Sequence, residues 1–330
     1  MLNFRSIFKD DINNFLAIRE TVLSDSTFKR YIRYLTSFDV FLANIGLHEK
    51  EISEPIFNEW QKTITGKVIT KAGKIVIIRT FIRYLQSLGV SAYTPVIPKI
   101  PNDYIPYIFS DEELNQIFSV ADNIISTKAQ PNPYLKTAFP MILRILYGSG
   151  LRIGETLALQ MKDIDFDGGI LRILHAKNDK FRLVPMSPSL TEILRRYCLA
   201  IGIFSSPDAF LFPSPDPKRP MSLQTVKNKF EVILKNLGIK LPNRKRYERG
   251  PCQHCLRHVF VLKSFTKAQK NGRNIDDNVP FLSIYLGHDS LKETEKYLKF
   301  SSELFPDALK LFEDYTTLVF PEADYEKQTV

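Results

Sequence analysis

The stretch Leu286-Gly287-His288, followed by Tyr297 nine residues after the histidine, decides our interpretation of this chain. Two earlier stretches carry related side chains: Gly150-Leu151-Arg152-Ile153-Gly154-Glu155 and His254-Cys255-Leu256-Arg257-His258. A phenol, two arginines and several histidines suit attack on a phosphodiester by tyrosine, because arginine forks hold phosphate oxygens and offset their charge. The pattern therefore favours phosphoryl transfer without a metal.

Length and composition indicate a soluble protein of two domains. The chain has 330 residues, of which 44% are hydrophobic and 25% are charged. No apolar run reaches the roughly 20 residues of a transmembrane helix, and the N-terminus lacks the apolar core of a signal peptide. Only three cysteines occur, which favours a reducing compartment. We expect a cytoplasmic, nucleoid-associated protein with no membrane partner.

The charge distribution points to nucleic acid. The net charge is +9, and no acidic residue lies between Glu59 and Asp103. Two basic clusters, one in each half of the chain, suit a phosphate backbone, although each alone could be a solvated face. The residues expected to contact DNA are Lys67, Lys71, Lys74, Arg79 and Arg83 in the first cluster, and Arg244, Lys245 and Arg246 in the second.

Proline and helical periodicity divide the chain. Residues 1–94 show helical spacing of apolar side chains, including a helix expected from about Thr70 to Leu88 that has a core side and a basic side. Residues 95–107 are rich in proline, which favours an extended linker. We expect a second domain at 108–305 and a tail at 306–330, whose segment Leu309 to Phe320 is a candidate for docking on a neighbouring subunit or on its own domain.

The second domain reads as mainly helical with a small antiparallel sheet. Ser110 to Glu113 forms a capping-box pattern. Strands are expected at 170–174 and 181–185, joined by a polar turn. Helices are expected near 135–147, 152–161, 189–201, 222–237, 255–270, 280–286 and 291–299.

Other tyrosines are alternatives to Tyr297 as the nucleophile. Tyr285 and Tyr315 compete with Tyr297 as nucleophile, but Tyr285 lies in an apolar run typical of a core.

A zinc site would need a tetrahedral set of cysteine and histidine ligands. The candidates are Cys252, His254, Cys255, His258 and His288. Their spacing matches no second pair elsewhere, so we expect no metal and no cofactor.

Together these motifs resemble those of the tyrosine recombinase, or phage integrase, family. The resemblance extends in order over the second domain, and the helical, basic first domain is similar to the family's core-binding domain. The segment from Ala176 to Pro185 resembles the family's Gly-Lys-Gly-Asn-Lys-x-Arg-x-Val-Pro hairpin, with departures at Ala176 and Asp179. The resemblance implies a mainly α, two-domain DNA clamp.

The resemblance also implies a role for each site residue. Tyr297 is the nucleophile. The catalytic residues beside it are Arg152 and Arg257 as phosphate clamps, His288 as a further phosphate ligand, His254 as acid, base or ligand, and Lys177 as the acid for the leaving oxygen. Glu155 and His258 support the site.

The implied activity is site-specific recombination of duplex DNA through a 3′-phosphotyrosyl intermediate and a Holliday junction. The working form is expected to be a homo-tetramer, of bacterial or mobile-element origin, without a separate arm-binding domain. Two alternatives stay open: a type IB topoisomerase, which relaxes plasmids without a target site, and a non-catalytic DNA-binding protein of the same fold.

Overall fold

The computed structural model describes residues 3–100, 106–124, 132–174, 181–240, 250–295 and 297. The chain divides into two compact units, Met1–Tyr104 and Ile105–Val330. The division falls inside the proline-rich segment 95–107, where the sequence predicts the linker.

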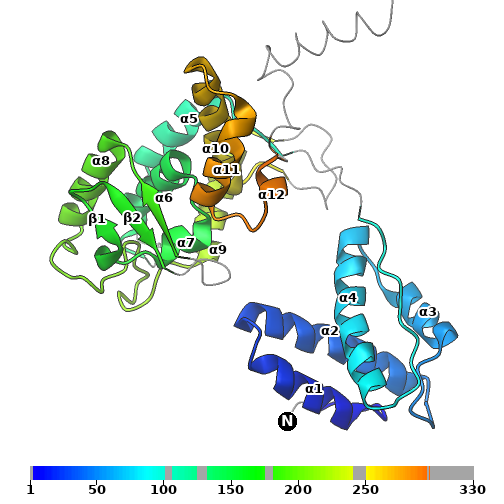
Figure 1. The fold of residues 1–330 in the computed structure, drawn as a ribbon. Coiled ribbons are helices and arrows are strands. Elements are labelled where there is room, and N and C mark those ends of the chain that lie inside the picture. The colour runs from blue at the N-terminus through cyan, green and yellow to red at the C-terminus, as the bar shows by residue number, and fades with distance from the viewer. Residues whose placement is uncertain are drawn as a thin grey trace, which may run out of the picture. The chain divides into compact units, whose positions relative to one another are not determined.

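The described part of the first unit is built from helices (Figure 1). Their bounds are α1 (Lys9–Glu20), α2 (Asp25–Asn44), α3 (Glu54–Thr63) and α4 (Val68–Ser87). Helix α2 starts after Ser24, whose backbone is extended, and stops before Gly46, which has a φ of +64° that favours glycine. Helix α4 packs against both α1 and α2.

Aromatic side chains fill the core of the first unit. Phe15 packs on Phe81, with ring centroids 5.4 Å apart, and Phe38 meets Trp60 edge to face at 4.9 Å. All four side chains are almost completely buried. Buried aromatic pairs of this kind contribute about 0.5–1.5 kcal/mol each beyond the area that they bury.

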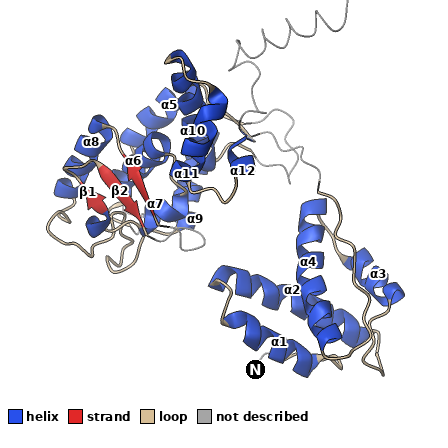
Figure 2. Ribbon diagram, in the orientation of Figure 1, coloured by secondary structure: helices blue, strands red, loops and turns tan. Residues whose placement is uncertain are grey.

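The second unit places a layer of helices beside a small sheet (Figure 2). The helices before and beside the sheet are α5 (Asp111–Asp122), α6 (Leu135–Ser149), α7 (Ile153–Ala158), α8 (Pro188–Ala200) and α9 (Leu223–Asn236). The helices that follow are α10 (His254–Lys270), α11 (Ile275–Leu286) and α12 (Leu291–Glu295). The capping box expected at Ser110 and Glu113 is present at the start of α5.

Helix α6 lies at the centre of this unit. It contacts α5, α8 and α10, and most of its side chains are buried. It ends at Gly150, whose φ is +61°. A Cβ at Gly150 would come within 2.4 Å of the Phe260 ring on α10, so the close packing of α6 on α10 requires glycine here.

The sheet has three antiparallel strands in the order β1-β2-β3. Their bounds are β1 (Ile164–Asp165), β2 (Ile170–Ile173) and β3 (Arg182–Pro185). The register pairs Ile173 with Arg182, so β2 and β3 form the two antiparallel strands of the expected hairpin. Strands were expected only at 170–174 and 181–185, and the structure adds the two-residue strand β1 before them.

Two helices differ from the sequence-based expectation. Helix α7 does not run from 152 to 161, because Leu159 leaves helical geometry (φ −59°, ψ 135°) and a 3₁₀ turn, η1 (Met161–Asp163), follows. Helix α11 begins at Ile275 instead of 280 and carries Pro280 in its interior. Within the described ranges, no helix combines the length and apolar content needed to cross a membrane.

Candidate active site

The first arginine of the site is held at the start of α7. Arg152 is the N-cap residue, and the Glu155 carboxylate accepts its backbone N–H at 2.9 Å and its Nη1 at 3.0 Å. The guanidinium also donates to the carbonyls of Leu286 (3.4 Å) and Gly287 (3.2 Å). Arg152 and Glu155 together close the first turn of α7 as a capping box. The arrangement aims the half-buried guanidinium at the loop after α11.

A second arginine shares the same carboxylate. Arg182, the first residue of β3, donates from Nη1 to Glu155 Oε1 at 3.1 Å and from Nη2 to Oε2 at 2.7 Å. Its Nε donates to the Tyr285 carbonyl at 2.9 Å. Arg182 lies in the segment from Ala176 to Pro185 that resembles the family's hairpin, and no role was predicted for it. The structure shows that it joins the hairpin strand to Glu155 and to the end of α11.

The charge of Glu155 is maintained by these two arginines. Burial raises the pKa of Glu155, but hydrogen bonds from Arg182 and from the Arg152 backbone, together with both positive charges, lower it below its ordinary value overall. Glu155 is 5% exposed and Arg182 is 8% exposed. A carboxylate buried to this extent needs paired donors, since an isolated buried charge is costly.

The arginine of the second motif is the most deeply buried cation of the site. Arg257 on α10 is 1% exposed. It donates from Nη1 to the Gly150 carbonyl at 2.6 Å and from Nη2 to the Leu286 carbonyl at 3.0 Å. Burial lowers the pKa of Arg257 to about 10, which still leaves it charged at neutral pH.

His288 lies against this guanidinium. Its Nε2 is 3.0 Å from Arg257 Nη2, and its Nδ1 is 2.6 Å from Thr294 Oγ1. Burial, followed by the charges of Arg257, Arg152 and Arg182, lowers the pKa of His288 to about 3. His288 is therefore neutral at physiological pH in this structure. Gly287, with a φ of +64°, turns the chain out of α11 and brings His288 to this position.

Tyr297 closes the group. Its side chain is 6% exposed, and its ring lies 5.2 Å from the His258 ring and 6.2 Å, nearly parallel, from the His288 ring. Burial raises the pKa of Tyr297, while the Arg257 charge and a hydrogen bond with Arg257 lower it in part. The phenol thus lies beside the guanidinium that also contacts His288.

The rival tyrosine has a different environment. Tyr285 stacks on Phe260 with ring centroids 5.5 Å apart, and its hydroxyl donates to the Pro185 carbonyl at 3.3 Å. Burial raises its pKa to about 12. These contacts suit a core tyrosine.

Comparisons with known proteins identify the family. Residues 108–303 match the phage integrase family. This match extends over more than half of the chain. The chain belongs to the phage integrase family.

Its relatives are named tyrosine recombinases. One from Pseudothermotoga lettingae is 29% identical over 286 residues, which is 84% of this chain and 88% of that protein. Tyrosine recombinase XerD of Vibrio cholerae is 25% identical over 272 residues, covering 80% and 78% of the two chains. In fold, the chain is similar to the XerH site-specific recombinase bound to a palindromic difH substrate, with a TM-score of 0.65, 19% identity and coverage of 95% and 91%.

Of the remaining expected residues, His254 is described, and several others lie outside the described residues. His254 is the first residue of α10 and is exposed, and its ring is 4.8 Å from that of His258. Lys177 and the cluster Arg244, Lys245 and Arg246 lie outside the described residues, as does the tail 306–330. Their roles stay predictions.

The cysteines of the alternative zinc site lie at the start of α10. The Cys252 and Cys255 sulfurs are 3.9 Å apart. In the part of the chain that the structure describes, no three cysteine, histidine or acidic side chains are grouped as metal ligands.

The basic residues of α4 are less uniform than expected. Lys67, directly before α4, and Arg83 are exposed, whereas Lys71, Lys74 and Arg79 are half-buried. Lys74 Nζ lies 5.7 Å from the centre of the Tyr34 ring. A clean separation of a basic side from a core side therefore holds only for part of this helix.

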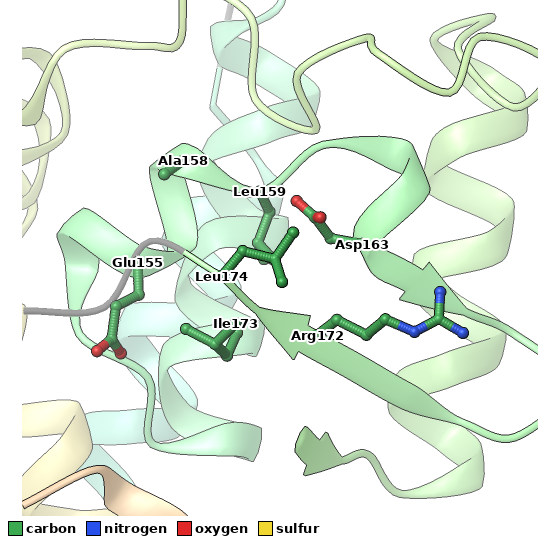
Figure 3. A pocket seen from close by; sticks show the side chains of 7 residues that line it. All are labelled: Glu155, Ala158, Leu159, Asp163, Arg172, Ile173 and Leu174. Atoms are coloured by element: carbon green, nitrogen blue, oxygen red, sulfur yellow. The ribbon is translucent and has the colours of Figure 1, made fainter. Parts of the chain in front are cut away.

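A small hollow lies behind Glu155 (Figure 3). It is lined from α7, η1 and β2 by Glu155, Ala158, Leu159, Asp163, Arg172, Ile173 and Leu174. In the figure, the Glu155 carboxylate points away from the Asp163 carboxylate. Asp163 accepts the Gln160 N–H through Oδ2 at 2.9 Å. Two buried acids therefore line the hollow, and of these two Glu155 is the one that accepts hydrogen bonds from Arg152 and Arg182.

Proposed function

We propose that this chain is a site-specific recombinase in which Tyr297 attacks a phosphodiester of duplex DNA. The observation that carries the proposal is the position of the Tyr297 hydroxyl beside Arg257, in a group that also contains Arg152 and His288. A nucleophile, two guanidinium groups and an imidazole from separate parts of the sequence meet there.

The proposed step exchanges one phosphate ester for another. The Tyr297 oxygen forms a bond to phosphorus, and the bond from phosphorus to the 5′ oxygen breaks, which leaves a 3′-phosphotyrosyl link and a 5′ hydroxyl. The phenol proton is lost to a base, for which His254 is the candidate, and Lys177 gives a proton to the 5′ oxygen. A partner strand's 5′ hydroxyl then reverses the step, and repeated exchange passes through a Holliday junction.

The arginines supply charge stabilisation. Attack places additional negative charge on the non-bridging phosphate oxygens, and guanidinium groups bind such oxygens through paired N–H donors. Arg257 is fixed by the Gly150 and Leu286 carbonyls, and Arg152 by Glu155, so both groups are oriented before DNA binds. Preorganised donors of this kind commonly change a rate by about 10²–10³-fold.

Relatives support duplex DNA as the partner. XerH is described bound to its difH substrate, and a lambda integrase dimer is described bound to a core site. The net charge of +9 suits the same partner here. We further propose a homo-tetramer acting on two DNA sites in the cytoplasm, with the first unit as core-binding domain.

Selection followed by covalent capture tests this proposal. Duplexes that bind the protein are selected from a random-sequence library and remade with a nick at each successive position. A nick beside the cleaved phosphate lets the short fragment leave, so a covalent adduct accumulates. We expect an adduct on the selected sequence alone. Absence of any adduct would contradict catalysis, and equal plasmid relaxation with and without that sequence would favour a topoisomerase.

A further inference from the structure

One threonine contacts the site although no sequence motif pointed to it. Thr294 lies on α12, three residues before Tyr297, and its side chain is completely buried. Its hydroxyl is 2.6 Å from Nδ1 of His288. Helix α12 itself packs on α11, so this contact joins the segment that leads to Tyr297 to the loop that carries His288.

The contact of Nε2, the second ring nitrogen of His288, decides which atom donates and which accepts between Nδ1 and Thr294. Nε2 of His288 faces Nη2 of Arg257 at 3.0 Å. A guanidinium has only donors, so Nε2 must accept with its lone pair. A neutral imidazole has one proton, which must then be on Nδ1, where Thr294 Oγ1 accepts it. The two contacts together select one tautomer.

The charges around the ring keep it neutral. Arg257 from α10, Arg152 from α7 and Arg182 from β3 all oppose a second proton, and burial does the same, whereas neighbouring Asp289 favours it. The Tyr297 ring is nearly parallel to the His288 ring, with the ring centroids 6.2 Å apart. In this state Nε2 accepts a hydrogen bond and has no proton to donate.

We propose that Thr294 is a positioning residue that holds His288 in the Nδ1–H tautomer, with Nε2 directed at Arg257 and at the phosphate that Arg257 binds. The role of Thr294 in cleavage rests on the function proposed above, whereas the tautomer itself does not. For Nε2 to donate to a phosphate oxygen, His288 must either take up a second proton or move its proton from Nδ1 to Nε2, in which case the Thr294 hydroxyl would donate to Nδ1.

Nitrogen NMR tests the tautomer without DNA. The protein is labelled with ¹⁵N-histidine, and the His288 signals are assigned from their loss in His288→Gln. We expect a protonated Nδ1 and an unprotonated Nε2 for His288 at neutral pH. A protonated Nε2 with a bare Nδ1 would overturn the inference, whether or not the protein cleaves DNA.

Variants of Thr294 test its contribution to cleavage. Thr294→Val keeps the shape and removes the acceptor, and Thr294→Ser restores it. On the selected, nicked duplex we expect Thr294→Val to slow single-turnover cleavage about 3- to 10-fold, the usual contribution of one hydrogen bond, and Thr294→Ser to recover most of that loss. Thr266→Val removes a hydroxyl that donates to the Leu262 carbonyl within α10, and it serves as the matched control.

A double-variant cycle separates positioning from a structural effect. If Thr294 acts through His288, adding Thr294→Val to His288→Ala slows cleavage no further. An equal loss in both backgrounds would contradict the positioning role. Wild-type protein without any adduct would instead contradict the proposed function and leave the NMR result to decide the tautomer.

Discussion

The two units differ in how many charged side chains they bury. The first unit buries aromatic rings such as Phe15, Phe38 and Trp60, and its one buried charged side chain among the described residues is Asp39, which accepts backbone N–H groups of Arg5 and Ser6. The second unit buries two arginines and a glutamate near its centre. Burying charge costs free energy that an apolar core avoids. The difference agrees with our proposal that the second unit carries the chemistry and the first unit binds DNA.

The largest expected effect comes from the centre of the second unit. Arg257→Lys keeps the charge but loses the fork that reaches Gly150, Leu286 and His288. We expect single-turnover cleavage of the selected duplex to fall by about 10²–10³-fold. Arg144→Lys, which alters an arginine paired with Asp122 on the surface of the same unit, is the control and should stay near the wild-type rate. An equal loss of cleavage rate in both variants would contradict the difference between the buried arginine and the surface arginine.

Stability should follow burial in the same way. Arg182→Gln leaves Glu155 short of two hydrogen bonds in a buried setting, so the free energy of unfolding should fall by about 3–5 kcal/mol. Asp208→Asn removes the exposed partner of Lys162 and should cost at most about 1 kcal/mol. Urea unfolding monitored by circular dichroism measures both. A loss for Arg182→Gln no greater than for Asp208→Asn would show that the buried pair adds nothing.

Acid should weaken the second unit through Glu155. Its folded-state pKa is below the ordinary value of 4.5, so its contribution to stability is present above pH 4.5 and is lost as pH falls through the lowered value. We expect Glu155→Gln to be less stable than the wild type near neutral pH, and the gap to narrow below pH 4.5. Unfolding midpoints in urea across this pH range provide the measurement. A gap independent of pH would exclude the carboxylate charge as the cause.

The smallest effects are expected in the first unit. Lys67→Ala and Arg83→Ala remove exposed charges at α4, so each should lower the salt dependence of DNA binding by about one unit of slope. Cleavage at saturating DNA should be unchanged. Lys29→Ala, at an exposed residue paired with Asp25, is the matched control and should leave the slope as it is. A change in the saturated rate would place these residues in the chemistry and remove the contrast.

Local patterns in the sequence predicted most of the fold. Helices such as α4 and α9 were found because the apolar spacing and the glycine after each helix agree within one segment. Helix α11 was placed five residues too late: the chain is already helical from Ile275 and continues through Pro280. Helix α7 was drawn too long because nothing local marks the change of backbone at Leu159.

The site was predictable where a motif carries it. Arg152, Arg257, His288 and Tyr297, which the motifs point to, lie together in the structure, and their roles stay predictions. Arg182 was not chosen, because its role depends on contacts with Glu155 and Tyr285, which are 27 and 103 residues away. Thr294 was missed for a similar reason, because its proposed role depends on the contact of its hydroxyl with Nδ1 of His288, which no sequence pattern shows.

The central claim is that Tyr297 is the nucleophile. The most direct measurement is mass spectrometry of the covalent adduct after digestion, with wild type, Tyr297→Phe and Tyr285→Phe compared on the selected, nicked duplex. We expect the nucleotide on the peptide that contains Tyr297, no adduct with Tyr297→Phe, and an adduct with Tyr285→Phe. An adduct that persists in Tyr297→Phe, or that maps to another residue, would contradict the account.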